Sequence, residues 1–157
     1  FTKRCVSSPI VVGDLAFGTE GSGGGGNVLF ALNLKSPEHE VVYSVQRSAP
    51  YVPTPVARDG LVFLWSDQGI VSCITATDGK VQWTKRIGGN VSSSPVIAGD
   101  KLIGVAEDGT VTILSATANF EEIGAVKLGE TMRATPLVGA SYLLFRTNSK
   151  LVCVGTP

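Results

Sequence analysis

A four-fold internal repeat is the feature of this sequence that most restricts its fold. Four segments resemble one another, and each begins with Ser-Pro or Thr-Pro followed by a short apolar run. Their prolines are Pro9, Pro55, Pro95 and Pro136, at intervals of 46, 40 and 41 residues. Four matches at nearly one period indicate that the chain repeats a single supersecondary unit.

Each repeat carries the signals of short antiparallel strands. Proline is tolerated at the first residue of a strand, where its missing N–H costs least. In the first three units a Gly-Asp or Asp-Gly turn such as Asp59-Gly60 follows, which favours a tight hairpin. A second and a third strand come next, for example Leu61–Trp65 and Ile70–Thr75, and a fourth run such as 80–87 closes each of these units. The fourth unit ends at its third strand, and no segment shows a sustained helical period.

Four short antiparallel strands in a unit of about 40 residues form one propeller blade. We therefore predict an all-β fold, a β-propeller of four antiparallel four-stranded blades that make up part of a larger ring. The four blades are expected near residues 1–45, 46–88, 89–129 and 130–157. Neighbouring blades cover both faces of each sheet, which agrees with a composition of 43% hydrophobic and only 17% charged residues. Solenoids are disfavoured because the hairpin turns do not suit parallel rungs or helices.

Charge and hydropathy exclude several classes of function. Thirteen basic residues balance thirteen acidic ones, which argues against a nucleic-acid-binding or anionic-membrane surface. No apolar run approaches the roughly 18 residues of a membrane-spanning helix. Three widely spaced cysteines, Cys5, Cys73 and Cys153, favour small buried thiols over a disulfide framework. Cys73 and Cys153 occupy nearly the same repeat position two blades apart, so we expect no bond between them.

The second repeat resembles the tryptophan-docking motif of the quinoprotein-like (PQQ-like) β-propeller family. In that motif a small residue, an acidic residue and Thr-Gly precede a tryptophan, and Ser-Ser-Pro-Val follows. Cys73 takes the place of the small residue, Asp78 that of the threonine, and Gly79 and Trp83 match directly. The resemblance implies that Trp83 and Gly79 form a structural dock between blades. Tyr43 replaces the tryptophan in the first blade and Ile123 in the third.

The resemblance also implies a compartment, a ring size and an assembly. Members of the family include periplasmic scaffold proteins, secreted propellers and quinone-dependent dehydrogenases. The chain looks most like the secreted or periplasmic members that are not dehydrogenases, which typically have seven or eight blades. We therefore expect a periplasmic or secreted protein, although residues 1–6 show no apolar signal-peptide region. The chain lacks an initiator methionine and is expected to be cut from something longer. Its open sheet edges need either the remaining blades of the same protein or a second copy, which would give a homodimer.

One ring face is the expected binding surface. In a four-stranded blade, the turns between the second and third strands lie on the same face as the links between blades. Arginine, tyrosine and tryptophan on that face are typical of interface hot spots. The residues that we expect to contact a protein or peptide partner are Arg47, Tyr51, Trp65, Asp67, Arg133 and Arg146. Trp65 could equally pack between blades, and a carbohydrate-binding module would require exposed faces on Trp65 and Tyr51.

Catalytic interpretations of the sequence are weaker. Residues 21–27 are mostly glycine, but no Gly-Lys-Ser/Thr follows, so a long turn is favoured over a phosphate-binding loop. His39 is the sole histidine and is expected in a solvated turn. Quinone chemistry would need a calcium site, which no segment resembles. We expect a non-catalytic binding scaffold without cofactor or metal; the alternative is a fragment of a quinone- or metal-dependent oxidoreductase.

Overall fold

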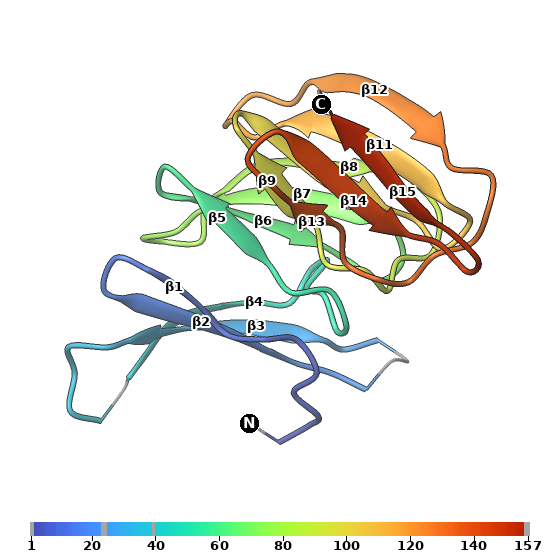
Figure 1. Cartoon of the computed structure of the whole chain (residues 1–157). Helices are drawn as coiled ribbons and strands as arrows, with labels where there is room; N and C mark the ends of the chain where they lie inside the picture. The colour runs from blue at the N-terminus through green and yellow to red at the C-terminus, as the bar shows by residue number, and fades with distance from the viewer. Residues whose placement is uncertain (1, 23–24, 39, 156–157) are drawn as a thin grey trace.

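The computed structural model describes residues 2–22, 25–38 and 40–155 and consists of strands and turns. Fifteen strands form four antiparallel sheets, each with its strands in sequence order (Figure 1). This confirms the predicted all-β propeller fold as an open, partial ring. In the described part of the chain, no helix is long and apolar enough to cross a membrane.

Each sheet is one blade. The first blade comprises β1 (Ile10–Val12), β2 (Leu15–Glu20), β3 (Val28–Asn33) and β4 (Val41–Val45). The second blade comprises β5 (Val56–Arg58), β6 (Leu61–Trp65), β7 (Ile70–Thr75) and β8 (Val81–Arg86). The third blade comprises β9 (Val96–Ala98), β10 (Lys101–Val105), β11 (Thr110–Ser115) and β12 (Glu122–Lys127). The fourth blade comprises β13 (Leu137–Val138), β14 (Tyr142–Arg146) and β15 (Leu151–Gly155), and has no fourth strand among the described residues.

Local sequence explains the hairpins. Between β5 and β6, Asp59 and Gly60 both have positive φ angles, 50° and 76°, as a type I′ turn requires. This turn matches the right-handed twist of its two strands, and β5 pairs with β6 from Val56↔Phe63 to Arg58↔Leu61. The Asp-Gly signal therefore places this hairpin where the sequence predicts it.

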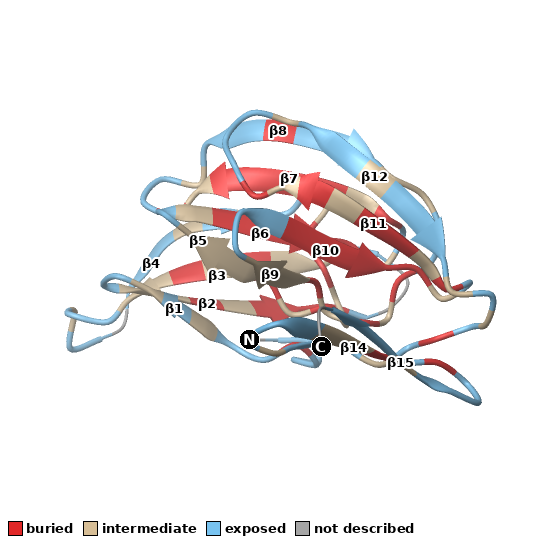
Figure 2. Ribbon diagram, turned by 45° about the horizontal axis from the view of Figure 1, so that its top comes forward, coloured by how far each residue is buried: buried red, intermediate tan, exposed pale blue. Residues whose placement is uncertain are grey.

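The first strands of the blades lie at the inner side of the ring and the fourth strands at its rim. β1 contacts β5, and β9 contacts β13. Figure 2 shows that the middle strands β6, β7, β10 and β11 of the second and third blades are largely buried, whereas β8 and β12 are mostly exposed. The short inner strands bring the blades together, and the longer middle strands supply most of the core.

Three hydrophobic clusters form the core, one at each junction between blades. The junction of blades 1 and 2 includes Phe17 and Leu64, and that of blades 3 and 4 includes Ile103 and Phe145. The junction of blades 2 and 3 holds the largest cluster, which contains Trp65 and Trp83. Each blade is thus stabilised mainly by its neighbours, as expected for a repeat protein.

An aromatic residue on the fourth strand docks the second blade onto the third. Trp83 is 8% exposed, and its indole Nε1–H donates to the backbone carbonyl of Thr117 at 3.0 Å. Its ring makes an edge contact with Phe120 of the third blade, with a centroid distance of 5.3 Å. The position therefore links two blades through both packing and a hydrogen bond.

Tyr43 makes the equivalent contact between the first two blades. Its hydroxyl donates to the backbone carbonyl of Ala76 at 2.6 Å, and its ring lies where a Cβ on Gly79 would be. Gly79 has a φ of 71°, so glycine satisfies both the turn and the close approach. Burial, and then the nearby charge of Asp78, raise the pKa of Tyr43 to about 12.

The third blade differs from the sequence prediction at the docking position of its fourth strand, which Trp83 and Tyr43 occupy in the other two blades. Trp83 pairs with Cys73 and Tyr43 pairs with Ala31, but the corresponding partner of Ile113 is Gly124. A bulge in each fourth strand inserts one residue before this position, and in the third blade the inserted residue is Ile123. The assignment of Ile123 to the docking position is therefore wrong by one residue, and Ile123 is 47% exposed.

The cysteines are free, as expected, but they are not equally buried. Cys73 is fully buried, and this burial raises the pKa of its thiol to about 11. Cys5 and Cys153 are exposed, which corrects the expectation of three buried thiols. Cys73 pairs with Phe63 and Cys153 with Leu144, so the two cysteines hold the same repeat position in different surroundings.

Candidate binding face

The turns between second and third strands lie beside the links that join consecutive blades. The backbone N–H of Val91 donates to the carbonyl of Asp67 at 2.9 Å, and that of Met132 donates to the carbonyl of Glu107 at 3.1 Å. Because this bond recurs from blade to blade, the turns and links form one continuous surface, which we call the turn-and-link face.

A groove of about 1040 Å³ opens on this face at the third and fourth blades. Its walls come from the link 131–134 and from the segment 146–151 of the fourth blade. Asn90, Glu107 and Asp108 complete the lining on the side of the third blade. The groove therefore gathers charged side chains of both signs.

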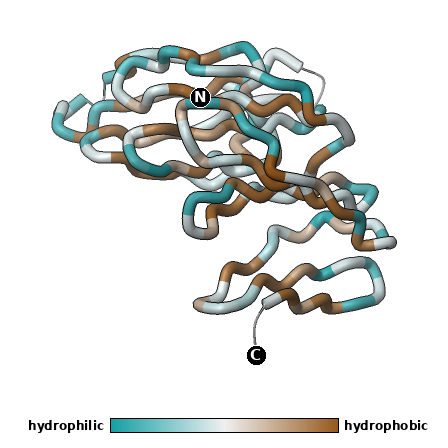
Figure 3. The backbone as a smooth tube through the Cα atoms, turned by 90° about the horizontal axis from the view of Figure 1, so that it is seen from above, coloured by the Kyte–Doolittle hydropathy of each residue, from teal (hydrophilic) through white to brown (hydrophobic). Residues whose placement is uncertain are grey.

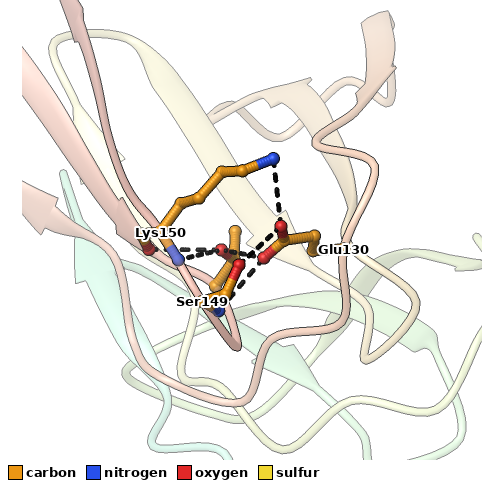
Figure 4. Close-up of polar contacts among 4 residues, drawn as sticks. Glu130, Ser149 and Lys150 are labelled. Carbon is orange, nitrogen blue, oxygen red and sulfur yellow. Dashed lines mark hydrogen bonds and ion pairs between the residues drawn. The ribbon is translucent and has the colours of Figure 1, made fainter.

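A carboxylate fixes the fourth-blade wall of this groove. Glu130 accepts hydrogen bonds from the hydroxyl of Thr147 at 2.7 Å and from the backbone N–H and hydroxyl of Ser149 at 3.1 and 2.8 Å (Figure 4). It also forms an ion pair with Lys150 at 3.0 Å. These donors, the Thr147 hydroxyl first among them, lower the pKa of Glu130 to about 2. Glu130 thus holds link and turn together in its ionised form.

A second carboxylate orients an arginine at the groove. Glu107 accepts a hydrogen bond from the Ser92 hydroxyl and one from Nη2 of Arg133 at 3.2 Å. The Ser92 bond is the main cause that lowers the pKa of Glu107, and the charge of Arg133 adds to it. The side chain of Arg133 is nevertheless 77% exposed, so its other guanidinium donors face solvent. Arg133 is thus both positioned and available.

Arg146 and Asn148 also line the groove, as the sequence prediction of this face requires. Arg146 is exposed at the end of β14, where it pairs with Leu151, and within the described part of the chain its side chain has no hydrogen-bond or ion-pair partner. Glu107 and Glu130 by contrast each neutralise a cation. Arg146 therefore lines the groove as a cation with which no described carboxylate forms an ion pair.

Asp67 and Tyr51 lie on the same face at the junction of blades 1 and 2, away from the groove. The Asp67 carboxylate accepts the backbone N–H groups of Tyr51 and Val52 at 2.7 and 3.0 Å. Both oxygens are used to hold the link, and the Tyr51 side chain is half-buried. The structure therefore gives Asp67 a structural role that its sequence position did not indicate.

Trp65 does not lie on the exposed surface. It is 2% exposed, and its ring fills the space next to the backbone of Gly104 in the third blade. Its prediction as a partner contact is wrong, because the indole packs between blades; this also removes the flat exposed face that a carbohydrate site would need. Gly104 leaves room for the ring because it has no Cβ. Trp65 and Gly104 belong to different repeats, so their contact is hard to recognise from the sequence.

Arg47 and the glycine-rich segment lie at the first blade. Arg47 is exposed, outside the groove, and without a polar partner among the described residues. A smaller cavity of about 190 Å³ lies between Gly25–Asn27 and the turn at Ser66–Gln68. Residues 23–24 and His39 lie outside the described residues.

The fold and the repeat register agree with a known sequence family. The family model PQQ_2, described as outer membrane protein assembly factor BamB, matches residues 25–119, more than half of the chain. The chain belongs to this PQQ-like propeller family. The matched segment contains Tyr43, Gly79 and Trp83, the residues that dock one blade onto the next.

Several solved structures share the fold at low sequence identity. BamB from Moraxella catarrhalis superposes with a TM-score of 0.77 and 16% identity over 99% of this chain and 46% of that chain. The computationally designed Ika4 protein superposes with a TM-score of 0.75 and 9% sequence identity over 100% of this chain and 94% of the Ika4 chain. Quinohemoprotein alcohol dehydrogenase from Comamonas testosteroni superposes with a TM-score of 0.63 and 14% sequence identity over 80% of this chain and 21% of the dehydrogenase chain. The chain thus spans less than half of the BamB and dehydrogenase chains.

No curated protein matches the sequence. The dehydrogenase relative raises the question of a quinone cofactor with a metal ion. Within the described residues, no three histidine, cysteine, aspartate or glutamate side chains come together as metal ligands.

Proposed function

We propose that this chain is a non-catalytic propeller scaffold that binds a segment of another protein on its turn-and-link face. The observation that carries the proposal is the groove at blades 3 and 4, where Glu107 holds an Arg133 that is 77% exposed. Arginine is enriched at interface hot spots because its planar guanidinium makes several directed hydrogen bonds. An oriented arginine whose remaining guanidinium N–H groups face solvent is suited to contacting a partner protein.

The carboxylates of the groove support binding rather than acid–base catalysis. A general acid or base works best with a pKa near the operating pH. Glu107 and Glu130 instead have pKa values below their ordinary range, because hydroxyl groups and cations stabilise their charged forms. Both groups hold the links in place, which is a structural task.

The charge of the groove points to a partner segment that carries a carboxylate. Arg146 has no internal counter-ion in the described part of the chain, and Arg133 shares only one nitrogen with Glu107. An aspartate or glutamate of the partner could pair with Arg133 through two parallel bonds. By analogy with the outer membrane assembly factor that names the family, we propose that this occurs outside the cytoplasm.

Selection of displayed random peptides against the immobilised chain tests the proposal. We expect acidic peptides to be enriched and Arg133→Glu to weaken their binding at least about tenfold, or about 1.4 kcal/mol. Lys35→Glu is the matched control, because Lys35 is an exposed cation on the opposite ring face, paired with Asp14 at 2.7 Å. Failure to enrich any peptide, or an equal loss of affinity in both variants, would overturn the proposal.

A further inference from the structure

A small cavity lies at the junction of blades 2 and 3, and each of these two blades has a described blade on both sides. Its volume is about 140 Å³. Its walls come from Trp65 at the end of β6, from the link 87–89 and from Ala106, Thr110 and Thr112 of the third blade. A protein cavity of about 150 Å³ can hold one benzene-sized molecule. This cavity therefore has room for one small ligand.

The indole of Trp65 brings an unpaired hydrogen-bond donor to this cavity. Trp65 is 2% exposed, and its Nε1 is buried without a hydrogen-bond partner in the described part of the chain. Trp83, in the same hydrophobic cluster, shows the usual arrangement, because its Nε1–H donates to the carbonyl of Thr117 at 3.0 Å. Buried donors are nearly always paired, since the loss of their hydrogen bonds to water is unfavourable. A bound molecule with an acceptor atom would satisfy the Trp65 N–H.

A hydroxyl group lies on the same side of the third blade as the Trp65 ring. Thr112 pairs with Gly104 across β10 and β11, and the ring packs where a Cβ on Gly104 would be. Thr112 is 5% exposed, and its side chain has no hydrogen-bond partner among the described residues. Figure 3 shows hydrophobic stretches along the strands and hydrophilic stretches in many of the turns. Two unpaired polar groups at one cavity between strands therefore stand out.

A carboxylate lies at the open side of the cavity. Asp108 lines both the cavity and the neighbouring groove, and its side chain is 59% exposed. The backbone N–H and the hydroxyl of Thr110 each donate to this carboxylate at 3.0 Å, and Lys127 lies 4.0 Å from it. The two bonds from Thr110, the backbone bond first, lower the pKa of Asp108. Asp108 is thus an oriented, ionised acceptor at the cavity entrance.

The three groups together favour a neutral ligand that both accepts and donates hydrogen bonds. The Trp65 N–H can only donate, and the ionised Asp108 can only accept. Ile87 and Val91 supply part of the apolar wall. A carboxylate would lose its hydration there and approach Asp108, whereas an ammonium group would offer no acceptor to Trp65. A carboxamide meets both requirements, because its oxygen accepts and its NH2 group donates.

We propose that this cavity binds a small neutral molecule that carries a carboxamide group. The amide oxygen accepts from Nε1–H of Trp65, and the amide NH2 group donates to the hydroxyl of Thr112 on one side and to the carboxylate of Asp108 on the other. Trp65 and Thr112 are almost fully buried, so only a ligand that enters the space between the blades reaches them. This favours a free small molecule over a side chain of a bound protein segment, and the site does not depend on the peptide binding proposed for the groove.

Titration with propionamide, followed through the indole resonances in ¹H–¹⁵N NMR spectra, tests this site. The chain contains two tryptophans, and Trp65→Phe identifies the resonance of Trp65. We expect propionamide to shift the Trp65 resonance in a saturable manner. The Trp83 resonance should not move, because its N–H is already paired with Thr117. Propylammonium and propionate, which have the same chain length but carry a charge, should leave both resonances unchanged.

A matched pair of variants tests the role of the hydroxyl. Thr112→Val keeps the shape of the side chain and should weaken propionamide binding at least about threefold. Thr84→Val is the control, because the Thr84 hydroxyl bonds to Ser72 at 2.9 Å outside the cavity, and its affinity should equal that of the wild type. An unmoved Trp65 resonance, a bound water that propionamide does not displace, or equal weakening in both variants would overturn the proposal. Tighter binding of the tripeptide Ala-Gln-Ala than of propionamide would also overturn it, in favour of an amide side chain from a partner protein.

Discussion

At the scale of single residues, Tyr43 and Trp83 perform the same task with different side chains. Each donates a hydrogen bond to a backbone carbonyl of the following blade and packs its ring against that blade. The tryptophan could be recognised from its motif, because glycine and proline signals surround it. Gly124 could not be recognised as the third-blade equivalent of Trp83. The pairing of β12 with β11 depends on a bulge whose position the residue pattern of β12 does not reveal.

Truncation of the Trp83 ring should be costly. Trp83→Ala removes a ring that contacts Phe63 and Phe120, and its hydrogen bond to Thr117. We expect a loss of about 3–5 kcal/mol in the free energy of unfolding, as for other large core truncations. Denaturant titration measures this, and the exposed neighbour Gln82→Ala should change the stability by less than about 0.5 kcal/mol. A near-neutral Trp83→Ala would show that the blades do not depend on this dock.

At the scale of secondary-structure elements, proline starts and Asp-Gly turns placed most strands within two residues of their observed ends. The prediction was less successful where two elements meet. For Trp65 the sequence left both a surface contact and packing between blades open, and Gly104 in the next repeat explains why the ring is buried. Similarly, Glu130 and Ser149 come together from a link and a turn that are distant in sequence, so their cluster was not foreseen. Contacts between repeats need the three-dimensional register.

The link that carries Glu130 should weaken in acid. The pKa of Glu130 in the folded chain is about 2, below its ordinary value of 4.5, so the ionised form stabilises the fold. This contribution is complete above about pH 4.5 and is lost as the pH falls towards 2. We expect Glu130→Gln to lower the melting temperature at pH 7 and the difference from wild type to shrink across this window.

Thermal scans from pH 7 to 2 provide the measurement. Glu122→Gln serves as the control, because Glu122 is exposed on β12 and forms no side-chain hydrogen bond among the described residues. A difference between Glu130→Gln and wild type that is constant over the whole pH range would contradict this role of the ionised carboxylate.

At the scale of the whole molecule, the four blades form an open row with a groove on one face. The sequence predicted that face from the order of strands alone, and two of the six residues expected to contact a partner there, Arg133 and Arg146, line the groove. It did not predict which junction would hold the groove, because this depends on how the link 131–134 lies against the last turn. The binding role of these residues remains a proposal that solution measurements can test.

Hydrogen–deuterium exchange with a selected peptide bound tests the proposed function most directly. We predict slower exchange in residues 131–134 and 146–151, which form the groove, and unchanged exchange in the turns 59–60 and 99–100 on the opposite face. Arg133→Glu should abolish this protection at the same peptide concentration. Protection confined to the opposite-face turns, or protection that persists in Arg133→Glu, would contradict binding through the turn-and-link face.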